Sequence, residues 1–249
     1  MVRQFLFILL LLHTIVTAQT KYFIKPDYVA IEKAVKNKAS AYYYPPMYQR
    51  FIKHDTTLIL DEYKYLYYGN FFADDMVTKA KQDTIVMNRI RELTKKENPD
   101  DNDRKEAIQL YEKQLTWAPF DLRAMNAIYS CYMGLHDSVK AYPYMYKLRK
   151  IVRVIHDSGN GLTDSTGYHV LIVSHEYFMI MALGYEFGGS QSLTPNQCDY
   201  MTLKSNEDNI PGLYFDVNQI FAGYAKMLNG ANFDELLKTI DDKKTKKKK

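Results

Sequence analysis

Apolar residues recur at intervals of three and four positions through the first two thirds of the chain, as in helices that bury one face. Capping residues, acidic residues or prolines stand where several of these stripes begin. The pattern predicts helices that start near Asp27, Pro45, Asp61, Asp74, Asp103, Asp121 and Asp137. The helix that starts at Asp74 is expected to reach Leu93, and Asp103 with Glu106 matches a capping box.

Two of these predicted helices carry a similar residue pattern 34 positions apart. Ala107 and Tyr111 in one helix correspond to Ala141 and Met145 in the other, and Pro119 follows the first of the two. A small residue with a large residue four positions later resembles a helix of a tetratricopeptide repeat. Because the Trp-Leu-Gly signature of that repeat is missing, the resemblance implies stacked helical hairpins and no chemistry.

The helical pattern ends at Ser158-Gly159-Asn160-Gly161. After it, the pattern predicts a doubly buried strand, a helix, two alternating strands and a last helix, at 168–173, 175–183, 199–203, 213–217 and 218–228. The glycine-rich residues 188–192 are expected to form a turn. The predicted fold class is therefore α+β, with a helical-hairpin, tetratricopeptide-like region at 19–157 and a small, mostly antiparallel α+β unit at 158–242.

Residues 1–18 have the layout of a cleavable signal peptide. Arg3 precedes the apolar run from Phe5 to Leu12, and Val16-Thr17-Ala18 supplies the small residues of a cleavage site after Ala18. The apolar run is shorter than the roughly 20 residues that span a bilayer. The sequence thus predicts a periplasmic or secreted protein without a transmembrane segment after signal removal.

The net positive charge is confined to the end of the chain. The formal charge of +4 becomes +3 without Arg3, and residues 243–249 contain six lysines, so residues 19–242 carry a charge of −3. An acidic body excludes nucleic acid as the expected partner. The lysine tail at 243–249 is expected to be disordered, and the alternative is a weak contact with an anionic surface.

Several motifs are shared with a known group of proteins. In the first half they are Tyr44-Pro45, Tyr48, Arg50, Asp55, Thr57-Leu58, Glu62-Tyr63 and Leu66-Tyr67-Tyr68-Gly69. Later ones are Ser158-Gly159-Asn160-Gly161, Gln191-Ser192-Leu193, Cys198-Asp199-Tyr200 and Leu213-Tyr214-Phe215-Asp216-Val217. With these motifs the chain resembles a family of small secreted proteins of unknown function from Gram-negative gut commensals. The resemblance implies an exported protein with repeat-like helices, and it implies no activity.

No group of residues has the spacing of a metal or cofactor site. His175-Glu176 lacks the second histidine of a zinc protease, and His169 with His175 has no third ligand. Asp157, Asn160 and Asp164 surround a glycine-rich loop, where a plain turn is favoured over a calcium site. The sequence therefore predicts no metal and no cofactor.

The two cysteines offer the one enzymatic alternative. Cys131 and Cys198 can form a bridge or stay separate, and two buried thiols are favoured. A cysteine hydrolase acting on envelope peptide bonds would use Cys131 as nucleophile, His169 as base and Asp216 to orient the base. Cys131, however, is expected in mid-helix, whereas reactive cysteines favour helix N-termini, where their pKa is lowered.

Tyrosine is the unusual component, with 22 residues in the chain. Tyrosine suits helix packing, and it also suits a ligand groove, because an apolar ring carries a hydrogen-bonding tip. Arg50 is the first candidate for a polar contact, and its alternative is an ion pair with Asp55 or Glu62. The candidate binding residues are Tyr48, Arg50, Tyr63, Tyr67 and Tyr68. The sequence predicts a non-enzymatic interaction protein that binds a protein or glycan in the bacterial envelope; a structural spacer without a ligand is the plainer possibility.

Overall fold

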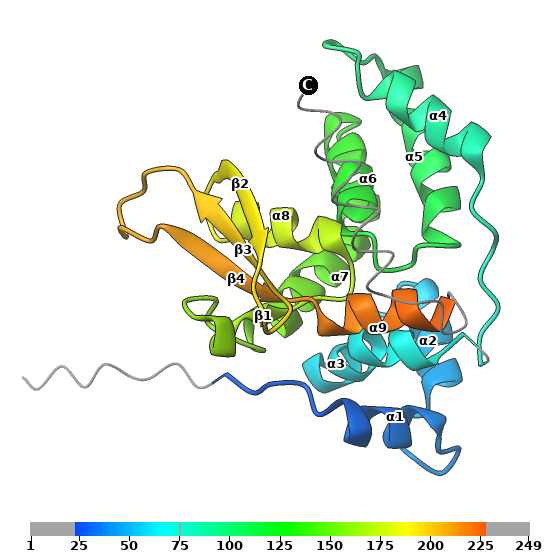
Figure 1. Cartoon of the computed structure of the whole chain (residues 1–249). Coiled ribbons are helices and arrows are strands. Elements are labelled where there is room, and N and C mark those ends of the chain that lie inside the picture. The colour runs from blue at the N-terminus through cyan, green and yellow to red at the C-terminus, as the bar shows by residue number, and fades with distance from the viewer. Residues whose placement is uncertain (1–22, 75, 228–249) are drawn as a thin grey trace, which may run out of the picture.

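The computed structural model describes residues 23–74 and 76–227 (Figure 1). In this part of the chain the helices are α1 (Tyr28–Lys36), α2 (Tyr44–Ile52), α3 (Leu60–Gly69), α4 (Thr84–Leu93), α5 (Asp101–Leu115), α6 (Leu122–Gly134), α7 (Ser138–His156), α8 (Val173–Ala182) and α9 (Asn218–Met227). The strands are β1 (Tyr168–His169), β2 (Phe187–Leu193), β3 (Cys198–Leu203) and β4 (Gly212–Asp216). A helical first part followed by a small sheet confirms the predicted α+β class.

Helices α4 to α7 pack as successive neighbours, with α4 against α5 and α6 against both α5 and α7 (Figure 1). Each of the last three begins at an aspartate whose carboxylate accepts backbone N–H groups: Asp100, Asp121 and Asp137. Ile108, Ile128 and Tyr144, one from each of α5, α6 and α7, form a small buried cluster. These packed helix pairs are the hairpins that the 34-residue pattern predicts.

The loop between α2 and α3 is fixed by one polar network. Arg50 donates to the carboxylate of Asp55 at 2.7 Å and to the hydroxyl of Thr57 at 3.1 Å, and it pairs with Glu62. The other carboxylate oxygen of Glu62 accepts the backbone N–H of Ile59 at 2.8 Å, which caps α3. The hydrogen bonds from Thr57 and Arg50 lower the pKa of Asp55 to about 2. The shared motif from Arg50 to Glu62 thus forms a polar network that joins the end of α2 to the start of α3.

Glu62→Gln should weaken this polar network, because the neutral amide of glutamine keeps the shape of the side chain but loses the charge that pairs with Arg50. We expect a loss of about 1–2 kcal/mol in the free energy of unfolding, measured by urea titration, since the Glu62 side chain is only 16% exposed. The control is Asp61→Asn, an exposed neighbour in the same helical turn, for which we expect a change of at most about 0.5 kcal/mol. Equal losses of unfolding free energy in the two variants would contradict the role of Glu62 in joining α2 to α3.

Tyrosines of α3 join the helices to the sheet region. The Tyr67 hydroxyl accepts the backbone N–H of Leu171 at 3.1 Å and lies 2.7 Å from Nδ1 of His175. The Tyr68 hydroxyl donates to the carbonyl of His169 at 3.3 Å. Gly69 permits close packing of α3 on α1, since a Cβ there would lie 2.7 Å from Cγ1 of Val35. A single buried cluster therefore contains side chains of the first helices and of the sheet.

The four strands lie in the order β1-β4-β3-β2, with β1 parallel to β4 and the other pairs antiparallel. Met201 and Phe215 point from the sheet into the core, and α7 and α8 lie behind the sheet in Figure 1. The loop before β1 is held by Gly161, whose carbonyl accepts the N–H of Tyr214 at 2.8 Å. Gly161 has a φ of +69°, which explains a glycine at this position. The mostly antiparallel sheet agrees with the sequence prediction.

Two predicted segments in the helical region differ from the structure. Residues 76–83 are not helical: α4 starts at Thr84, because the Asp83 carboxylate caps the N–H groups of Ile85 and Val86. The preceding chain instead runs along α5, where the N–H of Ala80 donates to the carbonyl of Thr116. The capping box of α5 starts three residues earlier than predicted, at Asp100. Local apolar spacing did not reveal either boundary.

The sheet also differs from the prediction at two places. Residues 187–193, expected to contain a turn, form the edge strand β2, whose side chains are mostly exposed. Backbone pairing with β3 creates this strand, so its side chains carry no alternating pattern. The predicted strand at 168–173 is shorter than expected. The strand β1 contains only residues 168 and 169, because the chain bends at residues 171–172 and α8 begins at Val173.

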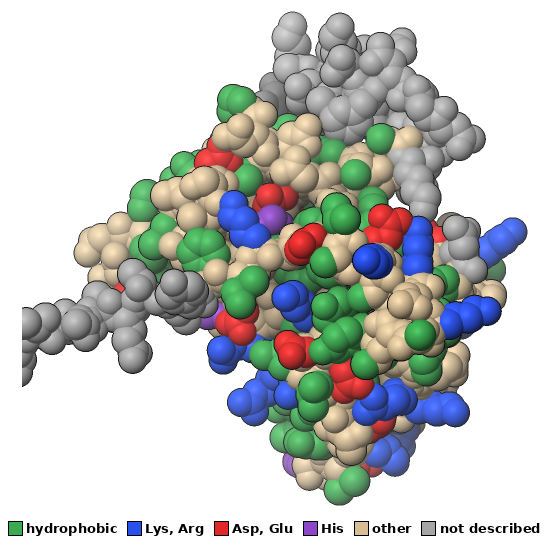
Figure 2. Space-filling view, turned by 90° about the horizontal axis from the view of Figure 1, so that it is seen from below, with side chains coloured by type: hydrophobic (Ala, Val, Ile, Leu, Met, Phe, Trp, Pro, Cys, Tyr) green, Lys and Arg blue, Asp and Glu red, His purple; other side chains and the backbone are tan. Residues whose placement is uncertain are grey.

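The predicted signal peptide at 1–18 and the lysine tail at 243–249 lie outside the described residues. Within the described residues, no helix combines the length and the apolar character needed to cross a membrane. Figure 2, which views the molecule from the side of α1 to α3, shows acidic and basic side chains interspersed on this face. That face therefore presents no large field of a single sign.

Candidate functional site

The tyrosines proposed from the sequence do not form a common surface. The side chains of Tyr63, Tyr67 and Tyr68 are buried in the core, with exposures of 0%, 0% and 1%. Arg50 is occupied by Asp55 and Glu62, which is the ion-pair alternative that the sequence left open. Of the five candidates, Tyr48 is the one that lines the largest pocket described below.

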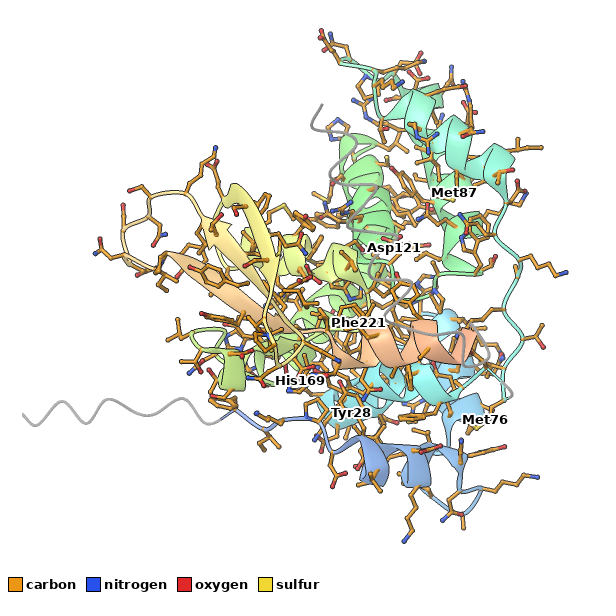
Figure 3. The ribbon with its side chains drawn as sticks, in the orientation of Figure 1. Tyr28, Met76, Met87, Asp121, His169 and Phe221 are labelled. Atoms are coloured by element: carbon orange, nitrogen blue, oxygen red, sulfur yellow. The ribbon has the colours of Figure 1, made fainter. Side chains whose placement is uncertain are left out.

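The residues of the hydrolase alternative are only partly brought together. His169 on β1 and Asp216 on β4 are register partners, and Nδ1 of His169 lies 3.6 Å from the Asp216 carboxylate. Figure 3 shows His169 beside Tyr28, whose ring centroid is 6.1 Å from the imidazole. Cys131 lies on α6, which is separated from β1 in Figure 1, and burial raises the pKa of its thiol. The structure thus gives Cys131 no base.

The cysteine that lies near Asp216 is Cys198, its register partner on β3. The Cys198 thiol is buried and donates to the backbone carbonyl of Asp164 at 3.1 Å. Burial and this hydrogen bond raise the pKa of the thiol, so it stays protonated. Both cysteines are free thiols, as the sequence favours, but of the two only Cys198 is buried and Cys131 is partly exposed. A protonated thiol bound to a carbonyl supports packing rather than nucleophilic chemistry.

The remaining polar candidates from the sequence are occupied in structural contacts. His175 is fully buried, and its Nε2 donates to the carbonyl of Phe120 at 2.9 Å. Asn160 holds its own turn by accepting the N–H of Leu162, and Asp164 accepts from Thr194 and Asn196. Over residues 23–74 and 76–227, no three His, Cys, Asp or Glu side chains form a group that could hold a metal ion.

The main cavity of the described residues lies between α2, α5, α7 and the extended segment 76–80. It has a volume of about 700 Å³, within the range of pockets that bind small molecules. Figure 3 shows Met76 on the segment that forms one wall. The apolar lining includes Phe51, Val77 and Leu115, and the polar lining includes Lys147. A largely apolar pocket with a few polar groups is the usual form of a ligand site.

Lys147 is the most unusual residue of this pocket. It belongs to the buried stripe of α7, with Tyr144 and Ile151, and its side chain is 5% exposed. The ammonium nitrogen lies 4.4 Å from the centroid of the Phe51 ring, and it forms no ion pair with any described residue. Burial lowers the pKa of Lys147 to about 7. A cation is therefore kept in an apolar wall without a counter-ion, which costs free energy.

His54 forms the second polar group of the wall. It follows α2 in a Schellman motif, in which its N–H donates to Phe51 and the N–H of Asp55 donates to Arg50. His54 occupies the left-handed position of this motif, with a φ of +60°, which is unfavourable for a residue other than glycine. Nδ1 of His54 is buried and has no hydrogen-bond partner among the described residues. Burial and the nearby Lys147 lower the pKa of His54 to about 4, so the ring is neutral.

Tyr144 and Glu112 complete the polar lining. The Tyr144 hydroxyl donates to the Glu112 carboxylate at 2.8 Å, and the Tyr144 ring contacts His54 edge-on, with 4.8 Å between the centroids. Glu112 lies on the exposed side of α5 and does not pair with Lys147. Tyr144 thus contacts both the exposed carboxylate and the imidazole of His54, while no hydrogen-bond acceptor among the described residues meets the amine of Lys147.

This arrangement can bind an anion and can handle protons. A ligand carboxylate placed against Lys147 would supply the missing counter-charge in a region of low dielectric, where the attraction is strong. An uncharged Lys147 amine is also a nucleophile or a base. Strongly shifted pKa values that converge in one cavity are typical of functional sites.

The sequence contains a signal for this site that the tyrosine count obscured. Lys147 stands one turn after Tyr144 and one turn before Ile151, within an otherwise apolar stripe. A lysine in such a stripe is unusual, because lysine is almost never fully buried without a partner. His54 left no comparable signal, since its environment depends on the path of residues 76–80.

The fold and pocket define a small α+β protein with a cavity beside its helical hairpins. Residues 29–226 match the profile of a protein family described as a domain of unknown function (DUF4919), and the chain belongs to this family. Membership of an uncharacterised family is what the shared motifs predict; export and a bacterial origin stay predictions. A search of the curated proteins finds no match, and neither does a search of the solved structures.

Proposed function

We propose that this protein binds an organic anion in the Lys147 pocket and acts as a binding protein rather than as an enzyme. The ligand carries a carboxylate or a similar acidic group that meets Lys147, and an apolar body that contacts Phe51, Val77 and Leu115. The acidic group can belong to a small molecule or to the end of a larger envelope component. The proposal shares with the sequence prediction a binding role without catalysis, but its ligand is an organic anion, whereas the sequence prediction names a protein or glycan.

The observation that carries the proposal is the buried ammonium without a counter-ion at the wall of a 700 Å³ cavity. A structural lysine in this position would be expected to pair with a carboxylate, because the desolvation of an unpaired charge is costly. The lining supplies Glu112, but its carboxylate accepts from Tyr144 instead. Lys147 is thus available to a ligand, and a neutral His54 next to it adds no repulsion.

Hexanoate should bind to the wild-type protein and raise its melting temperature. A ligand at a hundred times its dissociation constant stabilises the folded state by about 2.7 kcal/mol. For a chain of this size, that corresponds to a shift of roughly 5–10 °C, measured by differential scanning fluorimetry and confirmed by calorimetric titration. Hexanamide has the same shape without the charge and should give no comparable shift.

Two variants separate binding at Lys147 from a general effect of carboxylates. Lys147→Met keeps an unbranched apolar side chain and should abolish the hexanoate shift, whereas the same change at the partly exposed neighbour Lys150 should leave it intact. Glu112→Gln removes the nearest negative charge of the lining and should tighten hexanoate binding severalfold. A hexanoate shift that survives in Lys147→Met would overturn the proposal.

Export from the cytoplasm is the second part of the proposal, and it rests on the signal-peptide pattern of residues 1–18. We expect the mature protein to begin at Gln19 when the full chain is expressed in a Gram-negative host with its own leader. Amino-terminal sequencing of the periplasmic fraction measures this. An uncleaved chain that stays in the cytoplasmic fraction would contradict export and leave the pocket proposal to its own test.

A further inference from the structure

We propose that Lys147 captures its ligand covalently, as a reversible imine with a carbonyl group adjacent to the ligand's carboxylate. The ligand class is then a 2-oxo acid. This inference rests on the proposed function, because it assigns the chemistry of the same pocket. It adds a requirement that binding of a simple carboxylate does not have, namely a reactive carbonyl carbon.

The placement of the amine supports imine formation. Lys147 reaches the cavity from the middle of α7, a helix of 19 residues, so its position is fixed by a rigid element. Its nitrogen is held over the Phe51 ring and is not tied to a carboxylate, so no ion pair has to break before it reacts. An apolar wall favours the neutral, nucleophilic form of an amine.

The reaction balances without an external oxidant or reductant. The neutral amine attacks the carbonyl carbon, the C–N bond forms, and the carbonyl oxygen takes up a proton to give a carbinolamine. This hydroxyl then leaves as water with a second proton, and a C=N bond remains. Starting from the ammonium, one water is released and the protonated imine keeps the single positive charge. Hydrolysis by the reverse steps frees the ligand.

A carboxylate next to the carbonyl group of the ligand would balance the positive charge of the protonated imine. In the imine of a 2-oxo acid, the carboxylate lies one carbon from the protonated nitrogen, so a single buried cation serves both groups. The lining needs no second buried cation for the carboxylate. An aldehyde without an acidic group would leave the positive charge of the imine as unpaired as that of Lys147.

Two groups in the pocket wall can take part in the proton transfers of imine formation: His54, and the hydrogen-bonded pair of Tyr144 and Glu112. Nδ1 of His54 is buried without a partner, and the imidazole is close enough to Lys147 for the ammonium to lower its pKa. The Tyr144 hydroxyl, bound to Glu112, stands one helical turn from Lys147. We assign the proton transfers to His54, a neutral imidazole that lines the same cavity, and the Tyr144–Glu112 pair lies on the exposed side of that lining. His54→Phe should therefore slow capture more than it weakens hexanoate binding.

The test compares 2-oxohexanoate with hexanoate on the full chain at pH 7, in the presence of cyanoborohydride, which reduces an imine to a stable secondary amine. Intact-mass spectrometry should show one adduct with 2-oxohexanoate and none with hexanoate, and peptide mapping should place it on Lys147. At this pH, a lysine with a pKa near 7 is neutral about a thousandfold more often than an ordinary lysine. We expect labelling of Lys147 to exceed that of the partly exposed Lys150 by about a hundredfold or more.

Lys147→Arg and Lys147→Met should both lose the adduct, and Lys150→Arg should keep it. Lys147→Met guards against a folding defect, because removal of the buried charge should stabilise that variant. Adducts spread over the exposed lysines would overturn the imine. A hexanoate shift without any adduct from 2-oxohexanoate would refute the imine and leave the proposed function standing, whereas the absence of both would refute both.

Discussion

Lys147→Met should make the protein more stable, by about 2–4 kcal/mol at pH 7. The difference between the ordinary pKa of 10.5 and the value of about 7 that burial imposes corresponds to a destabilisation of about 4 kcal/mol at neutral pH. Methionine has a similar length and flexibility and needs no solvation of charge. Urea unfolding of the two proteins, followed by circular dichroism, measures the gain. Sites that sacrifice stability for binding commonly show this response.

The gain should depend on pH in a way that identifies its cause. Between about pH 7 and pH 10 the unfolded chain binds one more proton at Lys147 than the folded chain, so the stability of the wild type rises with pH across this window. Lys147→Met lacks this contribution, and the difference between the two proteins should be largest at pH 6 and small near pH 10. A gain that is constant over this range, or equal to that of Lys150→Met, would assign it to packing instead of charge.

Tyr67→Phe should cost about 2–4 kcal/mol, the largest loss that we expect from the removal of one atom. The hydroxyl is fully buried and serves two groups, the N–H of Leu171 and Nδ1 of His175. His175 is neutral, because burial lowers its pKa to about 4, and its Nε2 already donates to Phe120. Phenylalanine would leave both groups buried and unsatisfied, at about 1–3 kcal/mol each.

Tyr65→Phe is the matched control on the same helix. Tyr65 is partly exposed and stacks on Tyr42 with 3.8 Å between the ring centroids, and its hydroxyl forms no hydrogen bond with the described residues. We expect a change within about 0.5 kcal/mol. A loss in Tyr67→Phe that is no larger than this would show that α3 is not joined to the sheet region through Tyr67.

The parts of the fold that the sequence predicts are those with strong local patterns. The aspartates at 27, 121 and 137 cap helices as expected, because a cap is a contact between near neighbours in the chain. Residues 76–83 and the edge strand β2 were predicted wrongly, because their structures depend on backbone hydrogen bonds to Thr116 and to β3, which their own side chains do not indicate. Backbone pairing leaves little trace in side-chain identity.

The site was harder to predict than the fold. Abundant tyrosine pointed to a surface, yet Tyr63, Tyr67 and Tyr68 fill the interior, where the hydroxyls of Tyr67 and Tyr68 bond to backbone groups. Conversely, Lys147 gains its character from Phe51, which lies about a hundred positions earlier. The charge of a lysine is visible in a sequence, but the absence of a partner is visible only in three dimensions. The unpartnered Nδ1 of His54 is likewise visible only in three dimensions.

Titration of Lys147 itself tests the central claim most directly. Lysine labelled with ¹³C at the ε position, assigned by Lys147→Met, reports the charge of each amine by nuclear magnetic resonance. We expect the Lys147 signal of the free protein to titrate with a pKa of about 7, and that pKa to rise when hexanoate is bound. An ordinary pKa near 10.5 in the free protein, unchanged by hexanoate, would contradict the account.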